Sequence, residues 1–214
     1  MILFDCDGVL IDSELISAEC ASFELALTGM NISPRETLQR FLGRSRKEIA
    51  ETARYTALSD FVERLEASIR DRFERSLCAI DGVRDVLDRA ECKVCVTSGS
   101  SLAYIQRALE LTDLVAPFDD NLFSASMVSR PKPAPDLFLY AAAAMGVEPQ
   151  NCVVVEDSLS GIAAARAAGM FVIGFTGGSH LEADVVRTNY LAAGCGAVLE
   201  SMAELGRYLG GFEA

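Results

Sequence analysis

Short runs of apolar and β-branched residues alternate with helical segments over most of this chain, and this alternation restricts the possible folds more than any other feature. The clearest runs are at 2–4, 93–97 and 152–155, and polar residues follow each of them. Strands buried on both faces have continuous apolar sequences, and strands that alternate with helices form parallel sheets. The sequence therefore predicts an α/β fold, a doubly wound parallel sheet with a Rossmann-like core. Further strand candidates lie at 123–125, 171–175 and 197–199.

A long stretch between the first two apolar runs departs from this pattern. Residues 13 to 80 contain four segments with helical spacing and no strand candidate. Within it, Ser33-Pro34-Arg35-Glu36 is typical of a helix start, and Ser13 is placed to cap the first helix. We expect residues 13–81 to form an all-helical cap domain inserted after the first strand, and residues 1–12 and 82–214 to form the α/β core. Two short connections join these parts, which is the geometry of a hinge.

The composition limits the partners and compartments that suit this chain. Its 214 residues carry a formal net charge of −12, which argues against nucleic acids and membrane surfaces as partners. No uncharged apolar run approaches the roughly 20 residues that span a bilayer, and no basic leader precedes the first strand. Seven cysteines without C-x-x-C spacing indicate reduced thiols. We therefore expect a cytoplasmic protein that acts on a small molecule.

Polar groups that suit one kind of chemistry follow the predicted strands. Because the carboxyl ends of parallel strands share one edge of a sheet, these groups are expected to meet there. Two carboxylates as close as those of Asp5 and Asp7 repel each other unless a proton or a cation lies between them, and Mg²⁺ prefers carboxylate oxygens. The groups concerned are Asp5 and Asp7, then Ser98-Gly99-Ser100, then Lys132 in its proline-bounded loop, and finally Glu156-Asp157.

One economical interpretation of this set is phosphoryl transfer. Asp5 is a candidate carboxylate nucleophile that forms an aspartyl-phosphate, and Asp7 is a candidate acid and base for the leaving alcohol and for water. Ser98 and the amide of Gly99 can bind phosphate oxygens near a helix N-terminus, and Lys132 can supply a fixed positive charge. The predicted Mg²⁺ ligands are Asp5, Asp7, Glu156 and Asp157.

Four motifs in order give this chain a resemblance to the haloacid dehalogenase-like hydrolase superfamily. The segment from Phe4 to Glu14 resembles its first motif, 96–100 its second, 132–136 its third, and 155–158 with 161–169 its fourth. The resemblance covers nearly the whole chain. It implies a mobile helical cap, Mg²⁺ dependence and hydrolysis or transfer of phosphate esters. Within the superfamily the chain is most similar to sugar-phosphate phosphatases, such as 6-phosphogluconate phosphatase, and to β-phosphoglucomutase.

The departures from β-phosphoglucomutase concern the cap. Ser17 occupies the position that matches a cap-side histidine of the mutase, and the only histidine here, His180, is predicted to be a solvated loop residue. Arg46 matches a cap arginine that binds the distal phosphate in the mutase, and Arg44 is a second candidate for contact with substrate. The absence of the cap-side histidine favours hydrolysis over a mutase, which must favour sugar over water.

The sequence thus predicts a Mg²⁺-dependent phosphatase that hydrolyses a small phosphorylated metabolite, a sugar phosphate or a phosphosugar acid. A phosphomutase is the alternative. A receiver-type phospho-acceptor domain is a further alternative, because it also combines acidic residues, a lysine and Mg²⁺ on a doubly wound sheet. In receivers, however, the acceptor lies in the middle of the chain and no helical insertion follows it, whereas Asp5 is the fifth residue here. The sequence gives no indication of the oligomeric state.

Overall fold

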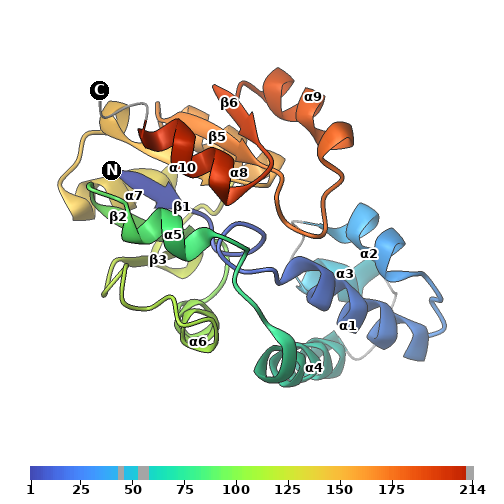
Figure 1. Cartoon of the computed structure of the whole chain (residues 1–214). Helices are drawn as coiled ribbons and strands as arrows, with labels where there is room; N and C mark the ends of the chain where they lie inside the picture. Colours follow the sequence, from blue (N-terminus) through green and yellow to red (C-terminus); the bar gives the residue numbers. More distant parts are fainter. Residues whose placement is uncertain (43–45, 53–57, 211–214) are drawn as a thin grey trace.

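The computed structural model describes residues 1–42, 46–52 and 58–210. Its centre is a six-stranded parallel sheet in the order β3-β2-β1-β4-β5-β6, so the predicted doubly wound fold is confirmed (Figure 1). The order reverses direction beside β1, which places the start of the chain at the crevice where α/β sheets bind ligands. The strands are β1 (Ile2–Phe4), β2 (Val94–Ser98), β3 (Leu122–Ser124), β4 (Val153–Glu156), β5 (Phe171–Phe175) and β6 (Ala197–Leu199).

Helices cover both faces of the sheet. Phe4 of β1 packs on the face covered by α5 (Val83–Asp88), α6 (Leu102–Leu111) and α10 (Met202–Gly210). Leu3 packs on the opposite face, because side chains of a strand alternate in direction. That face is covered by α7 (Asp136–Met145), α8 (Leu159–Ala167) and α9 (Ala183–Ala193), and two short 3₁₀ helices span Ala125–Met127 and Pro149–Asn151.

The sequence patterns did not predict α9. Its buried residues are limited to Tyr190, so its sequence lacks the wide apolar stripe by which amphipathic helices are identified. The strand prediction at 123–125 was displaced by one residue, because Ala125 already belongs to a 3₁₀ turn.

Four helices between β1 and β2 form the inserted cap. They are α1 (Glu14–Leu27), α2 (Pro34–Phe41), α3 (Arg46–Thr52) and α4 (Leu58–Ser76), and they pack around their own apolar cluster. Ser33 and Glu36 form the predicted capping box. Ser13 does not cap α1 as expected, because its hydroxyl is engaged with Asp7 instead. We keep residues 13–81 as the proposed extent of the cap. Within the described ranges, no helix combines the length and apolar character needed to cross a bilayer.

The two connections between cap and core run side by side. The N–H of Asp12 donates to the carbonyl of Cys78 at 3.0 Å, and the N–H of Ile80 donates to the carbonyl of Leu10 at 2.9 Å. Ile11 and Ala79 pair in antiparallel fashion between these bonds. The predicted hinge connections therefore form a narrow hydrogen-bonded ribbon.

Candidate active site

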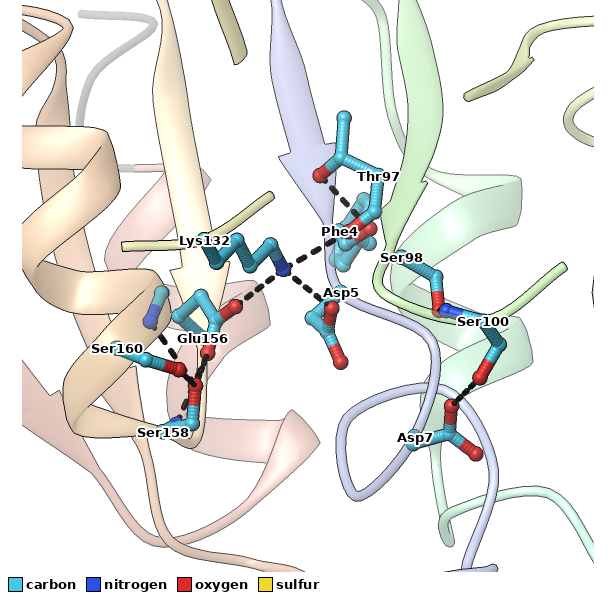
Figure 2. A network of polar contacts seen from close by, with 11 residues as sticks. Phe4, Asp5, Asp7, Thr97, Ser98, Ser100, Lys132, Glu156, Ser158 and Ser160 are labelled. Atoms are coloured by element: carbon cyan, nitrogen blue, oxygen red, sulfur yellow. Dashed lines mark hydrogen bonds and ion pairs between the residues drawn. The ribbon is translucent and has the colours of Figure 1, made fainter. Parts of the chain in front are cut away.

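Lys132 and two carboxylates form the buried centre of the site (Figure 2). The ammonium group of Lys132 donates to Asp5 Oδ1 at 2.6 Å, to Glu156 Oε1 at 2.5 Å and to the carbonyl of Thr97 at 3.0 Å. The side chains of Lys132 and Asp5 are about nine-tenths buried, and that of Glu156 is 1% exposed. Asp5 is fixed at the end of β1, where its N–H bonds to Val155 of β4. Neighbouring strand ends thus bring together residues that lie 127 and 24 positions apart.

The electrostatic balance at this centre is negative. Burial raises the pKa of Asp5 well above its ordinary value, against the opposing charge of Lys132, and the nearby carboxylates of Glu156, Asp157 and Asp7 raise it further. Burial also raises the pKa of Asp157, and the charge of Glu156 adds to this effect. Burial alone would lower the pKa of Lys132, but the charges of Asp5 and Glu156 outweigh it and raise the value. One ammonium therefore faces several carboxylates, and an added cation would relieve their repulsion.

Asp7 lies apart from this centre and accepts hydrogen bonds from three hydroxyl groups. Ser13 and Tyr104 each donate to its Oδ1 at 2.6 Å, and Ser100 donates to its Oδ2 at 3.0 Å. Asp5 and Asp7 therefore share one loop without pairing with each other. Sequence reasoning missed Tyr104, whose only signal is its place in the first turn of the helix that follows Ser98-Gly99-Ser100.

Ser98 and Gly99, the predicted phosphate-binding residues, lie beside the same edge. Ser98 ends β2, is 1% exposed, and accepts a hydrogen bond from the N–H of Ser100 at 3.0 Å, so its own proton remains available to a ligand. Gly99 is exposed, and a side chain added there would meet open space. Gly99 is therefore not required for packing, and its contribution would be its amide. Both residues line the cavity described below.

Glu156 and Asp157 face different partners although they are adjacent. The Oε2 atom of Glu156 accepts from the N–H and the hydroxyl of Ser158 at 2.9 and 2.8 Å, while its other oxygen binds Lys132. A side chain at position 161 would collide with the carboxyl of Glu156, so Gly161 leaves room for this arrangement. Asp157 instead points toward Gly8, whose φ of 74° and whose missing side chain let the first loop approach it.

His180 was wrongly predicted to be a solvated loop residue. Its imidazole is fully buried, with Nε2 at 3.1 Å from Asp157 Oδ2. Burial lowers its pKa, against the charges of Glu14, Asp12 and Asp7. The loop folds inward because Gly8 and Gly178 leave space for the ring, which a Cβ at either position would contact at 2.7 Å. Neither ring nitrogen makes a well-aligned hydrogen bond to a described residue. The position of the His180 ring beside Gly8 and Gly178 is a tertiary feature that the local sequence does not reveal.

The predicted metal ligands are close enough to interact but do not all converge. Among the described residues, no three side chains of His, Cys, Asp or Glu gather tightly enough to hold a metal ion. Glu156 is engaged by Lys132 and Ser158, and Asp7 by three hydroxyl groups. The oxygen donors and the excess negative charge nevertheless fit a hard cation such as Mg²⁺. The metal roles of Asp5, Asp7, Glu156 and Asp157 therefore stay predictions.

A cavity of about 790 Å³ lies between this edge of the sheet and the cap. Core residues such as Asp5, Lys132 and Ser98 line one side, and Glu14, Ser17 and Arg46 belong to its cap lining. The guanidinium carbon of Arg46 is 5.9 Å from the centre of the Tyr104 ring, and its Nη1 is 3.8 Å from Glu66 Oε1. Arg46 thus lines the cavity, and its contact with substrate stays a prediction. Arg44, the second candidate, lies outside the described residues. The remaining cap lining is largely apolar: Ala18, Ala21, Leu38, Phe41, Leu42, Ile49, Leu65 and Ile69.

Comparison with known proteins agrees with the resemblance seen in the motifs. Residues 1–169 match the model of the haloacid dehalogenase-like hydrolase family. The chain is 31% identical to a 6-phosphogluconate phosphatase of Escherichia coli over 184 residues, 84% of this chain and 83% of that protein. It is 34% identical to hexitol phosphatase B of the same species over 179 residues, 78% of this chain and 79% of that protein.

A crystal structure of a haloacid dehalogenase-like protein of unknown function from Agrobacterium tumefaciens superposes with a TM-score of 0.86 at 37% identity, covering 100% of this chain and 98% of that one. The predicted resemblance is thereby confirmed in sequence and in structure. The chain belongs to the haloacid dehalogenase-like hydrolase family.

Proposed function

We propose that this protein is a cytoplasmic, Mg²⁺-dependent phosphatase that hydrolyses a small phosphorylated metabolite through an aspartyl-phosphate intermediate. The observation that carries the proposal is the buried pair of Asp5 and Lys132 at the cavity wall. Lys132 binds one oxygen of the Asp5 carboxylate, and the other oxygen is directed away from it (Figure 2). This free oxygen is the nucleophile, because Lys132 holds the carboxylate in one orientation and offsets the repulsion of an incoming phosphate.

The first step moves a phosphoryl group from substrate to Asp5. The free oxygen of Asp5 forms a bond to phosphorus while the bond from phosphorus to the ester oxygen breaks. Asp7 gives its proton to the departing oxygen, which leaves as an alcohol. In the second step, water attacks the aspartyl-phosphate, Asp7 takes a proton from this water, and inorganic phosphate leaves with the Asp5 carboxylate restored.

Ser98, Gly99 and Lys132 hold the transferring group during both steps. The hydroxyl of Ser98 is free to donate because its oxygen accepts from the N–H of Ser100. The amide of Gly99 lies where a small residue leaves the approach open, and Lys132 supplies the charge. Donors placed around a phosphoryl group in a buried site stabilise the charge that it carries in the transition state.

The residues that would hold Mg²⁺ are Asp5 and Asp157, two of the predicted ligands, whose pKa values are raised by burial and by neighbouring carboxylates. Bound there, the ion would supply compensating charge to the nucleophile and the phosphate. Asp7 and Glu156, the other predicted ligands, already bind hydroxyl groups and Lys132 in this structure.

The cap selects the remainder of the substrate. Arg46 is the charged cap residue that we propose to contact the leaving group, and Arg44 is a further candidate on sequence grounds. Their guanidinium groups can bind a carboxylate or several hydroxyl groups. The similarity to a 6-phosphogluconate phosphatase and a hexitol phosphatase supports a sugar phosphate, a phosphosugar acid or a polyol phosphate as the substrate.

Release of inorganic phosphate from a panel of phosphorylated metabolites tests the proposal. The panel should include 6-phosphogluconate, sorbitol 6-phosphate, glucose 6-phosphate and β-glucose 1-phosphate with a bisphosphate primer. We expect phosphate release that EDTA abolishes and Mg²⁺ restores. Turnover that persists without metal would contradict the site. Isomerisation of β-glucose 1-phosphate without phosphate release would indicate a mutase. Stable phosphorylation by acetyl phosphate without turnover would indicate a receiver-type domain.

A further inference from the structure

Tyr104 lies where the core, the cap and the loop of Asp7 meet. It belongs to the first turn of α6 and packs against the apolar clusters of both the core and the cap. Its ring centre is 5.6 Å from that of Phe73 in α4, with an angle of 55° between the rings. On the cap side, the guanidinium carbon of Arg46 lies 5.9 Å from the ring centre. Residues of two cap helices therefore contact this ring directly.

The hydroxyl of Tyr104 is bound to Asp7. It donates to Oδ1 at 2.6 Å, and the hydroxyl of Ser13 donates to the same oxygen at 2.6 Å. Ser13 directly precedes α1, so the two donors to Oδ1 come from the two sides of the cap–core junction. Burial raises the pKa of Tyr104 well above its ordinary value, and the adjacent charge of Asp7 raises it further, so the phenol remains a neutral donor.

The two oxygens of Asp7 therefore have different surroundings. A carboxylate oxygen has about two lone-pair sites, and two hydroxyl donors fill those of Oδ1. Among the described residues, Oδ2 accepts one bond, from Ser100 at 3.0 Å, which leaves its second lone-pair site open. Ser100 adjoins the phosphate-binding pair Ser98-Gly99. Oδ1 is thus the anchored oxygen, and Oδ2 is the oxygen that can carry a proton toward the leaving group.

We infer that Tyr104 is a positioning residue that orients the Asp7 carboxylate for proton transfer at Oδ2, and that its own position is set by the cap. The inference rests on the proposed role of Asp7 as the acid for the leaving group. Tyr104, a helix residue outside the four motifs, would thus contribute to the chemical step. The alignment of Asp7 would then depend on where Phe73 and Arg46 lie.

Two aryl phosphates that differ in the basicity of their leaving groups test this inference with the full-length protein and Mg²⁺. Nitrophenolate is weakly basic and leaves from p-nitrophenyl phosphate with little help, whereas the phenolate of phenyl phosphate needs a proton donor. The quantity to measure is kcat/KM, which reports the first irreversible step, the departure of the leaving group. Because both substrates meet the same enzyme sample, the ratio of their kcat/KM values does not depend on the fraction of folded protein.

The first variant, Tyr104→Phe, keeps the ring against Phe73 and Arg46 and removes the hydroxyl alone. We expect a loss of about 10-fold in kcat/KM for phenyl phosphate, in the range of a hydrogen bond to a charged group, and a loss several-fold smaller for p-nitrophenyl phosphate. Equal losses on both substrates, or no loss on either, would overturn the inference.

Asp7→Asn separates this inference from the proposed function. If it slows phenyl phosphate far more than p-nitrophenyl phosphate, Asp7 is the acid, and the result for Tyr104→Phe decides the inference alone. If Asp7→Asn slows both substrates equally, the acid role fails and the inference falls with it. Phe73→Leu tests the cap link: a smaller loss with the same preference for phenyl phosphate supports the link, and a loss without that preference removes it.

Discussion

The core and the cap both line the cavity, but they hold their polar side chains very differently. In the core, Lys132 is about nine-tenths buried and bound to two carboxylates, and Asp7 accepts three hydrogen bonds. In the cap, the side chain of Arg46 is 35% exposed and lies 3.8 Å from Glu66. The groups that we propose to meet a transferring phosphoryl group are thus fixed by their neighbours. The cap group that would meet the variable part of a substrate is held loosely.

The core and the cap also differ in how they are packed. The strands of the core are buried on both faces, whereas the cap has its own smaller cluster. Besides the backbone ribbon, the contacts between cap and core include that of Phe73 with Tyr104 and two exposed ion pairs, Arg107 with Glu74 and Arg35 with Glu182. Exposed ion pairs contribute about 0–1 kcal/mol each. We therefore expect the cap to be stabilised mainly from within and to change position without unfolding of the core.

Asp5→Asn is expected to have the largest effect on activity. It should lower kcat for p-nitrophenyl phosphate by about 1,000-fold or more, because the amide cannot form the covalent intermediate. The midpoint of thermal unfolding at pH 7.5 should not fall by more than a few degrees, because burial already disfavours the charged form of Asp5. The matched control, Asp88→Asn on the exposed part of α5, should keep full activity. Substantial turnover by Asp5→Asn would remove Asp5 from the nucleophile role.

Lys132→Met should reduce both activity and stability. We expect about 3 kcal/mol less free energy of unfolding at pH 8 by denaturant titration, because Asp5 and Glu156 lose their buried counter-charge. The folded-state pKa of Lys132 is raised, so its stabilisation is complete below its unfolded pKa and is lost only as the pH rises through the folded value. The loss should be smaller at pH 5, where Asp5, with its raised pKa, is more often protonated.

The control for Lys132→Met is Lys47→Met in the cap. Lys47 is 74% exposed, with an ion pair to Glu51 at 3.9 Å, so this variant should change stability by less than about 0.5 kcal/mol. Similar losses for the two lysine variants would contradict the difference between core and cap described above.

Glu14→Gln should make the protein more stable at alkaline pH. Burial, followed by the charges of Asp7 and Asp157, raises the pKa of Glu14 from 4.5 to about 8. The unfolded chain therefore releases this proton at lower pH than the folded one, and Glu14 weakens the fold as pH rises from about 4.5 toward about 8. In EDTA, we expect wild type and variant to unfold alike at pH 4, below the unfolded pKa, and the variant to be about 1–2 kcal/mol more stable at pH 8.5. Equal stability at both pH values would show that solvent reaches this carboxylate.

Arg46→Ala should have the smallest effect. We expect KM for the best sugar or polyol phosphate of the panel to rise about 5-fold with kcat nearly unchanged, because the loss concerns binding of the leaving group. KM for p-nitrophenyl phosphate should change less, since its leaving group has no hydroxyl or carboxyl group to bind. Arg70→Ala, at an exposed position of α4, is the matched control. An unchanged KM for every substrate of the panel would exclude Arg46 from the binding site.

The fold and the centre of the site were predictable because both depend on strands. Apolar runs located β1, β2 and β4, and the groups that follow parallel strands meet at one edge, which brought Asp5, Ser98 and Glu156 together. Lys132, in its proline-bounded loop, also lies at this edge of the sheet, as predicted. The roles of these residues stay predictions, because geometry alone does not report a reaction.

The parts that sequence reasoning missed depend on packing between elements that are distant in the chain. Tyr104 reaches Asp7 because the first turn of α6 lies beside the loop that follows β1, and His180 is buried because two glycines allow a loop to approach β1. Ser13 was expected to cap α1 from its local pattern, but the carboxylate of Asp7 is a stronger partner for its hydroxyl. Local propensity identified the elements, and it did not identify which side chains bridge them.

The ribbon formed by residues 10–12 and 78–80 has a consequence for how such proteins diversify. Because the outgoing and returning backbones leave the sheet as hydrogen-bonded neighbours, everything between them is a cassette with a single narrow base. A foreign segment whose ends lie equally close can replace residues 13–77 while β1 and β2 keep their register. The proposed substrate range would then change by exchange of one contiguous piece of sequence, as long as the new piece keeps a donor to Asp7 and a contact to Tyr104 where Ser13 and Phe73 now supply them.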